Sequence, residues 1–227
     1  MNDVHILHPK NQNGPLLNNG KTFIKEACVE TLTQAVNAER KGADRIELCA
    51  DLSNDGLTPD DELIALVQKR VRVPVRVMIR PREGDFCYSD AELTTMKRAI
   101  DFCKNGGVQG VVFGVCKPDF TLDIETIREL AMHAKPLKVT IHKAIDTIND
   151  QVEGIRELSK LKLIDSVLSS GGKRTALEGI DVLKSMIENS GTIQVIACGK
   201  VTDSNLPSLH GLLNADAYHG KLIVGEI

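Results

Sequence analysis

The sequence is poor in aromatic residues and long hydrophobic runs, and it has no tryptophan. Only 3% of its 227 residues are Phe, Trp or Tyr. No apolar stretch approaches the roughly 18 residues that a membrane-spanning helix requires, so we expect no membrane span. The N-terminus also lacks a basic segment followed by an apolar one, which is the pattern of a secretory signal. These absences predict a cytoplasmic protein without a membrane partner.

Blocks of basic charge and paired cysteine motifs are missing as well. The 28 basic and 31 acidic residues give a net charge of −3. Because no basic patch alternates with aromatic residues, the sequence predicts no nucleic-acid partner and favours small-molecule chemistry. The six cysteines occur without C-x-x-C spacing, which disfavours both a disulfide framework and a zinc knuckle. We therefore expect reduced thiols.

What the sequence does contain is a repeated strand–loop–helix pattern that begins near Phe23. Eight strand candidates alternate with seven helices, which is typical of βα units around a parallel sheet. A doubly wound open sheet has similar local patterns, but the strand count favours a single (β/α)8 barrel of the TIM type over 22–227. The strands are expected at 23–28, 45–49, 75–80, 110–114, 138–142, 165–170, 193–198 and 216–219.

The two ends of the chain depart from this repeat. Residues 1–21 are rich in Asn, contain scattered Gly and Pro, and show no sustained period, so we expect a mobile N-terminal leader. After the eighth strand only 220–227 remain, too few for a helix of ordinary length. The barrel should be incomplete on that side, with its final helix missing or very short.

Several helices carry recognisable start and stop signals. Thr58-Pro59 predicts an N-cap followed by Pro at the first helical position, and Ser89-Asp-Ala-Glu92 is a capping box. An apolar stripe that starts at Leu177 predicts a further helix, which should end before Gly191.

The first two strands end alike, in Glu26-Ala-Cys28 and Glu47-Leu-Cys49. Side chains alternate along a strand, so each Glu shares a face with its Cys. Two carboxylates inside a barrel need a cationic partner, and Arg80, at the end of the third strand, is the natural candidate. These residues form either a structural Glu–Arg network or part of a catalytic site.

The two cysteines should stand at similar heights on neighbouring strands. Neighbouring strands lie about 4.8 Å apart, and two thiolates that close could bind a soft ion such as Cu(I). The alternative is that Cys28 and Cys49 simply pack as small hydrophobic residues, as buried free cysteines usually do.

His142 closes the fifth strand, and Asp146 follows four residues later. His142 could act as a general acid or base, because its ordinary pKa lies near neutrality, or it could be a hydrogen-bonded structural residue. Asp146 could orient His142 or cap the next turn. His219, which ends the eighth strand, could face the same cavity.

Glycine-containing loops follow the sixth and seventh strands. Ser170-Gly171-Gly172 and Cys198-Gly199-Lys200 could bring backbone N–H groups to an anion, with Arg80 and Lys200 adding positive charge. The alternative is that the glycines only serve tight turns that need positive φ.

Two long segments resemble the CutC copper homeostasis family: Asn37-Ala-Glu-Arg-Lys-Gly-Ala-Asp-Arg-Ile-Glu-Leu-Cys49 and Met78-Ile-Arg-Pro-Arg-Glu-Gly-Asp-Phe-Cys-Tyr-Ser-Asp90. The resemblance extends from about 26 to 219. It implies a cytoplasmic TIM barrel, often a homo-oligomer (dimer or higher), that is associated with copper tolerance and Cu(I). Carried over by position, the cavity residues are Glu26, Glu47, Arg80, Asp85, His142, Asp146 and Ser170, and the copper candidates are Cys28 and Cys49.

The chain departs from the family pattern in a few places. Lys143 stands where Arg is usual and Ile145 where Phe is usual, and Cys198-Gly199-Lys200 replaces a run of glycines. A lysine at 200 could supply charge to an anion or block the close backbone approach that glycine allows, which weakens the phosphate interpretation. Relatives also continue after His219 with small and basic residues.

The sequence favours two functions and does not exclude a third. The first is copper homeostasis with Cu(I) bound by Cys28 and Cys49. The alternative is an enzyme of unknown reaction on a small anionic, possibly phosphorylated, substrate, with Arg80 as anion clamp and His142 as acid–base group beside Glu26 or Glu47. A scaffold whose oligomer is the functional unit is the third.

Overall fold

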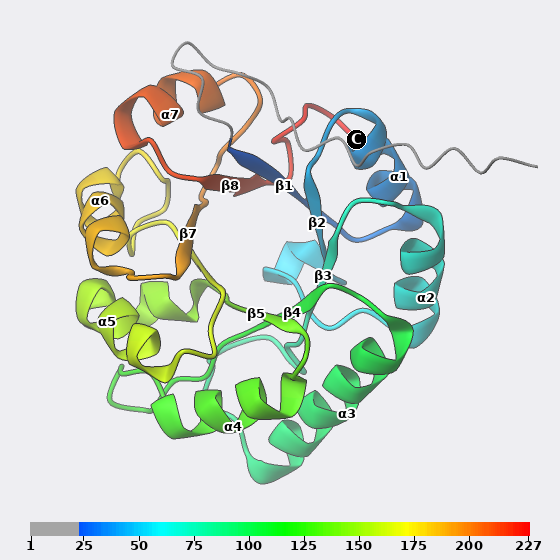
Figure 1. Ribbon diagram of the computed structural model, residues 1–227, viewed down its shortest axis with the longest axis horizontal. Coiled ribbons are helices and arrows are strands. Elements are labelled where there is room, and N and C mark those ends of the chain that lie inside the picture. Colours follow the sequence, from blue (N-terminus) through cyan, green and yellow to red (C-terminus); the bar gives the residue numbers. More distant parts are fainter. Residues whose placement is uncertain (1–22) are drawn as a thin grey trace, which may run out of the picture.

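The computed structural model describes residues 23–227, which form a closed barrel of eight parallel strands surrounded by helices (Figure 1). Each strand pairs with its sequence neighbours, and β1 closes the ring by pairing with β8. The predicted TIM-type barrel is confirmed. The predicted leader, residues 1–21, lies outside the described residues.

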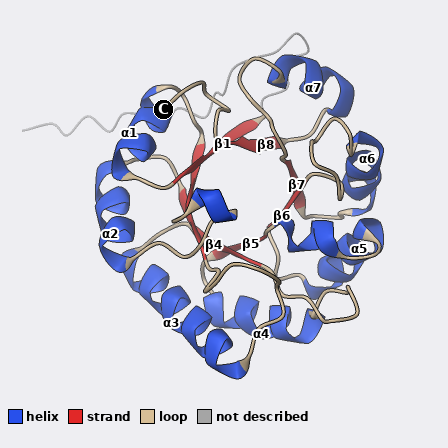
Figure 2. Ribbon diagram, turned by 180° about the vertical axis from the view of Figure 1, so that it is seen from behind, coloured by secondary structure: helices blue, strands red, loops and turns tan. Residues whose placement is uncertain are grey.

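All eight strands occur where the sequence predicts them, and most end one or two residues earlier. The reverse view shows them as a ring inside the helices (Figure 2). Their bounds are β1 Ile24–Val29, β2 Arg45–Leu48, β3 Val75–Met78, β4 Gly110–Phe113, β5 Lys138–Ile141, β6 Ser166–Ser169, β7 Gln194–Ala197 and β8 Ala217–Gly220.

The helices cover the outer face of the sheet. They are α1 Leu32–Arg40, α2 Asp61–Arg70, α3 Asp90–Gly106, α4 Ile124–Ala134, α5 Gln151–Leu161, α6 Ile180–Asn189 and α7 Leu206–Leu213, with two short 3-10 helices, η1 Leu52–Asn54 and η2 Lys143–Thr147. The predicted lack of a closing helix is confirmed for the described chain, because 221–227 contain only turns and isolated bridges.

Of three predicted helix starts, one is confirmed and two lie further along the chain. The capping box at Ser89 and Glu92 is confirmed. The Thr58 N-cap is wrong: α2 is capped by Asp60, whose carboxylate accepts from the Leu63 N–H, because a carboxylate three residues before a free N–H is an equally good cap. α6 begins at Ile180, and Leu177 precedes it with 60% of its surface exposed.

The main hydrophobic core lies between the barrel and its helices. Outward-facing strand residues such as Val77, Val111 and Val167 pack there against helix residues such as Ile100 and Leu130. The barrel interior is different, since it holds buried charged and hydroxyl side chains together with two small apolar clusters. Within 23–227, none of the helices has both the length and the apolar character to cross a bilayer.

Candidate functional site

A layer of charged side chains crosses the barrel interior where β8, β1 and β2 meet. The strand register places Glu26 beside His219 on one side and beside Arg45 on the other. The Arg45 Nε donates to Glu26 Oε2, and His219 Nδ1 lies 3.0 Å from Glu26 Oε1. All three residues are nearly inaccessible to solvent. Glu26 is therefore a buried carboxylate with a cation on each side.

The next layer toward the carboxyl ends contains Cys28, Glu47 and Arg76. Glu47 Oε2 lies 3.4 Å from Cys28 Sγ and 3.6 Å from His219 Nε2. Arg76 reaches the opposite wall, where its Nη1 donates to Thr140 and, over 2.9 Å, to Ser166 Oγ. Polar side chains from β1, β2, β3, β5, β6 and β8 therefore line the interior.

The two carboxylates have opposite electrostatic environments. Burial raises the pKa of Glu26, but Arg45 and His219 outweigh it and hold that pKa well below the ordinary value. Burial raises the pKa of Glu47 to about 8, and the negative charges of Cys28 and Glu26 add to this against the pull of His219. Near neutral pH, Glu26 is therefore ionised while Glu47 holds a proton.

The two candidate cysteines meet in this network. Cys28 Sγ lies 3.9 Å from Cys49 Sγ, and Cys49 Sγ lies 3.5 Å from Glu47 Oε2. The hydrogen bond from the Cys49 thiol lowers the pKa of Cys28 to about 5 with help from His219, despite burial. The same hydrogen bond raises the pKa of Cys49. The pair is thus one thiolate and one thiol.

The structure corrects the expected alignment of the two Glu-x-Cys ends. Cys28 is the register partner of Glu47, so Cys49 stands two residues further toward the carboxyl end of its strand than Cys28. Neighbouring barrel strands are staggered because they tilt against the barrel axis. The two sulfur atoms still meet, since both side chains face the interior.

The segment that contains η1 covers the cysteine pair. Leu52 packs with Cys28, Cys49 and Met78 in a small apolar cluster, and η1 crosses the mouth of the barrel in both views (Figures 1 and 2). Gly56 has a φ of +86°, and a Cβ there would lie 3.2 Å from Cys49 Sγ. The loop can lie this close to the sulfur only because residue 56 is glycine.

The predicted pairing of Arg80 with Glu26 and Glu47 is wrong. Arg80 Nη1 donates to the carbonyl oxygens of Asn54 at 2.8 Å and Gly56 at 3.2 Å, and Nη2 donates to that of Gly84 at 3.1 Å. The carboxylates take Arg45 and His219 instead. Arg80 holds the η1 segment in place, while its buried Nε has no partner among the described residues.

His142 lies next to Arg80 but away from the carboxylates. Its Nδ1 accepts from the Ala144 N–H over 3.1 Å, so its proton is on Nε2, a buried atom without a partner in the described chain. The His142 ring packs against Phe86 with centroids 4.8 Å apart. Burial and the nearby charge of Arg80 lower the pKa of His142 to about 3, so the imidazole is neutral.

Asp146 neither orients His142 nor caps a turn of its own; it organises the loop after β6. Its carboxylate accepts from the Ser170 and Gly172 N–H groups at 2.9 and 3.0 Å and from the Ser169 and Ser170 hydroxyls. The Gly171 N–H donates to Ser169 Oγ at 2.9 Å. The backbone donors that the sequence assigns to an anion are therefore bonded within the protein.

The loop after β7 packs against the loop after β6. Gly199 has a φ of +98°, and a Cβ there would lie 2.9 Å from the Ser170 Cβ. Lys200 adopts a left-handed φ of 55°, and its side chain is exposed. Close packing of two turns accounts for these glycines.

Sequence reasoning misses the partners of two residues in the network. It treats Arg45 only as a strand start, although alternation places this residue on the same face as Glu47 and Cys49. It places His219 in the cavity without a partner, yet His219 contacts both glutamates and belongs, with Cys28 and Glu47, to a buried group whose ligand atoms all lie within 4.8 Å of one another.

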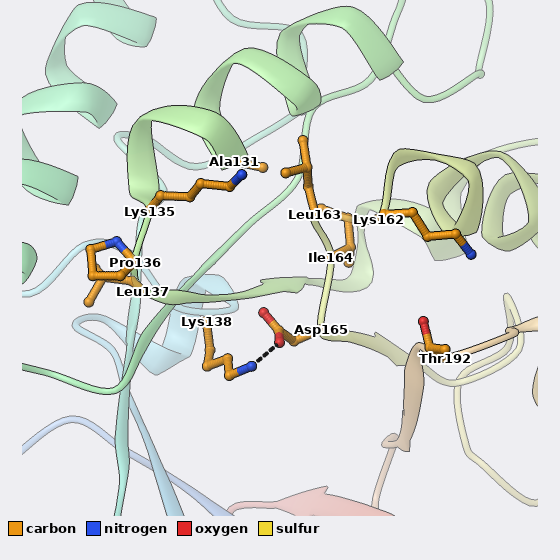
Figure 3. Close-up of a pocket in the computed structure, with 10 residues that line it drawn as sticks. All are labelled: Ala131, Lys135, Pro136, Leu137, Lys138, Lys162, Leu163, Ile164, Asp165 and Thr192. Carbon is orange, nitrogen blue, oxygen red and sulfur yellow. Dashed lines mark hydrogen bonds and ion pairs between the residues drawn. The ribbon is translucent and has the colours of Figure 1, made fainter.

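A separate pocket of about 560 Å³ lies at the opposite end of the barrel (Figure 3). It lies at the amino ends of β5 and β6, where Lys138 and Asp165 form an ion pair of 2.6 Å. None of the site residues predicted from the sequence lines it. Active sites of TIM barrels lie at the carboxyl ends of the strands, so this pocket does not belong to the candidate site.

Comparisons with known proteins agree with one another. A family model described as the CutC family matches residues 23–222. "Copper homeostasis protein cutC homolog" from Homo sapiens is 42% identical over 198 residues, which are 87% of this chain and 72% of the relative. A crystal structure of a provisionally assigned copper homeostasis protein CutC from Streptococcus agalactiae has a TM-score of 0.84 and 28% identity, covering 89% of this chain and 100% of that one.

More distant solved structures share only the architecture. An aldolase, QR15, has a TM-score of 0.65 at 13% identity and covers 92% of this chain and 94% of its own. At this identity the likeness shows the barrel fold alone, because this fold carries many unrelated chemistries.

Proposed function

This chain belongs to the CutC family, and we propose that it serves copper homeostasis by binding Cu(I) through Cys28 and Cys49. The observation that carries the proposal is the pair of buried sulfur atoms 3.9 Å apart. This separation is less than twice a metal–thiolate bond of about 2.3 Å, so one ion can reach both sulfurs.

The chemistry of the neighbouring donors supports a soft cation. Thiolates select Cu(I), and imidazole is a suitable further ligand. His219 is a further ligand in this proposal, and Glu26 fixes its ring through the bond to Nδ1, leaving Nε2 on the side of Cys28 and Glu47. Glu47 is protonated and offers only hard oxygen donors, so it serves beside the sulfurs as a hydrogen-bonding neighbour and not as a ligand.

A competition titration tests this function. Cu(I) should be taken from a calibrated chelator by the wild-type protein, and Cys28→Ser with Cys49→Ser should lose at least about 100-fold in affinity, since two of the soft donors are gone. Cys87→Ser, which changes a half-buried cysteine outside the network, is the matched control. Equal affinity of the double variant and the wild type would refute the proposal.

Two further parts of the proposal concern the setting of the protein. We place it in the cytoplasm, because its six cysteines are free and a reducing compartment keeps copper in the Cu(I) state. We also propose a homo-oligomer, as the family resemblance implies. Sedimentation velocity at micromolar concentration tests this, and a purely monomeric species would contradict it.

An enzyme acting on a small anion has one supporting observation. Arg80 Nε and His142 Nε2 are buried donors without a partner among residues 23–227, at the strand ends where TIM barrels place substrates. Asp146 accepts from the Ser170 and Gly172 N–H groups, and the Gly171 N–H donates to Ser169, so these residues would contribute only by shaping the loop. Binding of inorganic phosphate that Arg80→Met abolishes and Lys200→Met weakens would favour this second function.

A further inference from the structure

A pocket of about 350 Å³ opens at the rim of the barrel beside Cys28. Its walls include Glu30 after β1, Leu52 of η1, and Lys221 and Glu226 after β8. In Figure 1 this C-terminal segment, drawn red, runs from β8 toward α1. Cys28 lines the pocket and is 6% exposed, whereas Cys49 does not line it and has no exposed surface. The cysteine pair therefore has one accessible sulfur.

Charged groups of both signs line the pocket together with this sulfur. Lys221 Nζ donates to the Leu52 carbonyl over 2.8 Å, and Glu30 Oε2 accepts from the Leu52 N–H over 2.8 Å. An ammonium has three N–H donors and a carboxylate two oxygens, so each group can bind a ligand while it keeps Leu52 in place. Glu226, an exposed residue, adds a second carboxylate to the wall.

We propose that this pocket is the docking site of a small zwitterionic thiol that delivers Cu(I) to Cys28. The inference rests on the proposed function and adds the identity of the copper donor. Cu(I) prefers thiolate ligands and is therefore expected to reach the protein already bound to sulfur. A carboxylate of the carrier pairs with Lys221 and its ammonium with Glu30 or Glu226, which directs the carrier sulfur at Cys28. The volume matches the lower end of small-molecule sites.

The transfer is a ligand exchange without a change of oxidation state. The Cys28 sulfur forms a bond to Cu(I), and the bond between copper and the carrier sulfur breaks. The Cys28 thiolate displaces the carrier as a thiolate, which takes up the proton that the Cys49 thiol releases when it binds the copper, so charge and protons balance. Cys49 supplies the second sulfur from 3.9 Å away.

Loading kinetics from two copper sources test the proposal. Stopped-flow absorption of the copper–thiolate bands follows uptake from Cu(I)–glutathione, which is zwitterionic, and from the Cu(I)–acetonitrile complex, whose ligand is neutral. Lys221→Met should slow uptake from glutathione by about tenfold, because the charge that steers the carrier is lost. Uptake from acetonitrile should stay within about twofold of wild type. Lys221→Arg should load like wild type.

Lys160→Met is the matched control, since Lys160 is 71% exposed on α5, on the far side of the barrel (Figure 1). It should load at the wild-type rate from both sources. S-methylglutathione, whose capped sulfur is a poor copper carrier, should slow uptake from glutathione in the wild type but not in Lys221→Met. If Lys221→Met changes the uptake rate, relative to wild type, by the same factor for both sources, the docking site is overturned and copper binding is left intact. A wild type that takes copper from neither source overturns the proposed function.

Discussion

Cys28 lies directly opposite Glu47 in the register of β1 and β2, with its sulfur 3.4 Å from the carboxyl oxygen Oε2. Glu47 lies as close to Cys49, at 3.5 Å. One buried carboxyl group therefore serves both sulfurs. Because burial keeps that group protonated near neutral pH, it adds a hydrogen bond to the thiolate without adding a second negative charge.

This relationship predicts different effects of Glu47→Gln on two metals. Gln keeps the shape and a hydrogen-bond donor but is a poor metal ligand, so Cu(I) affinity should change by less than about tenfold, because the sulfurs dominate the binding of a soft ion. Zn(II), which accepts carboxylate oxygen, should lose more. Parallel titrations with both ions measure this. A larger loss for Cu(I) than for Zn(II) would show that Glu47 binds the copper directly.

The η1 segment, which covers the cysteine pair, predicts that two glycine substitutions have unequal effects on stability. Gly56→Ala meets an unfavourable φ of +86° and places a Cβ 3.2 Å from Cys49 Sγ. Gly107→Ala meets a similar φ of +72° but has no other atom within 4 Å. Gly107→Ala should cost about 1 kcal/mol of unfolding free energy, and Gly56→Ala at least about 1 kcal/mol more.

Urea denaturation of the two glycine variants gives the comparison. Because the added methyl group pushes on the sulfur, Gly56→Ala should also weaken Cu(I) binding, while Gly107→Ala should leave it unchanged. Equal stability and equal copper affinity of the two variants would mean that the η1 segment moves aside freely and does not constrain Cys49.

The buried pair of Arg45 and Glu26 predicts a strong single-variant effect that a second substitution relieves. Of the two cations that contact the carboxylate of Glu26, Arg45 and His219, Arg45→Met leaves only His219. Breaking a buried pair typically costs about 3–5 kcal/mol of unfolding free energy. Adding Glu26→Gln removes the stranded charge and should recover at least half of the loss. Unfolding free energies of the two single variants and the double variant complete the cycle. Additive losses would show that the two residues act independently.

The architecture could be predicted from the sequence, whereas much of the site could not. Eight strand patterns interrupted by caps and glycines are local signals, and they are strong enough to predict the barrel. Which strand positions face each other depends on the stagger of the closed sheet, so the opposition of Cys28 and Glu47 could not be predicted.

Partners supplied by the backbone are also hidden from sequence reasoning. The prediction pairs Arg80 with the two glutamates on charge alone. No side-chain pattern indicates that the carbonyl oxygens of Asn54 and Gly56 converge on Arg80. Arg45 could have been found, because it alternates with Glu47 on the same strand.

His142 predicts a specific pH dependence of stability. Its folded pKa of about 3 lies below the ordinary value of 6.5, so between these values the unfolded chain binds a proton that the folded protein does not. The contribution of His142 to stability is therefore complete above pH 6.5 and is lost as the pH falls toward 3. From pH 7.5 to 5 the loss should be about 2 kcal/mol.

His142→Asn keeps a side-chain acceptor for the Ala144 N–H but cannot take up the proton. Between pH 7.5 and 5 the unfolding free energy of this variant should therefore fall by about 2 kcal/mol less than that of the wild type. Urea denaturation of both proteins at four pH values measures the difference, and parallel curves would show that His142 is protonated equally in the folded and unfolded chains.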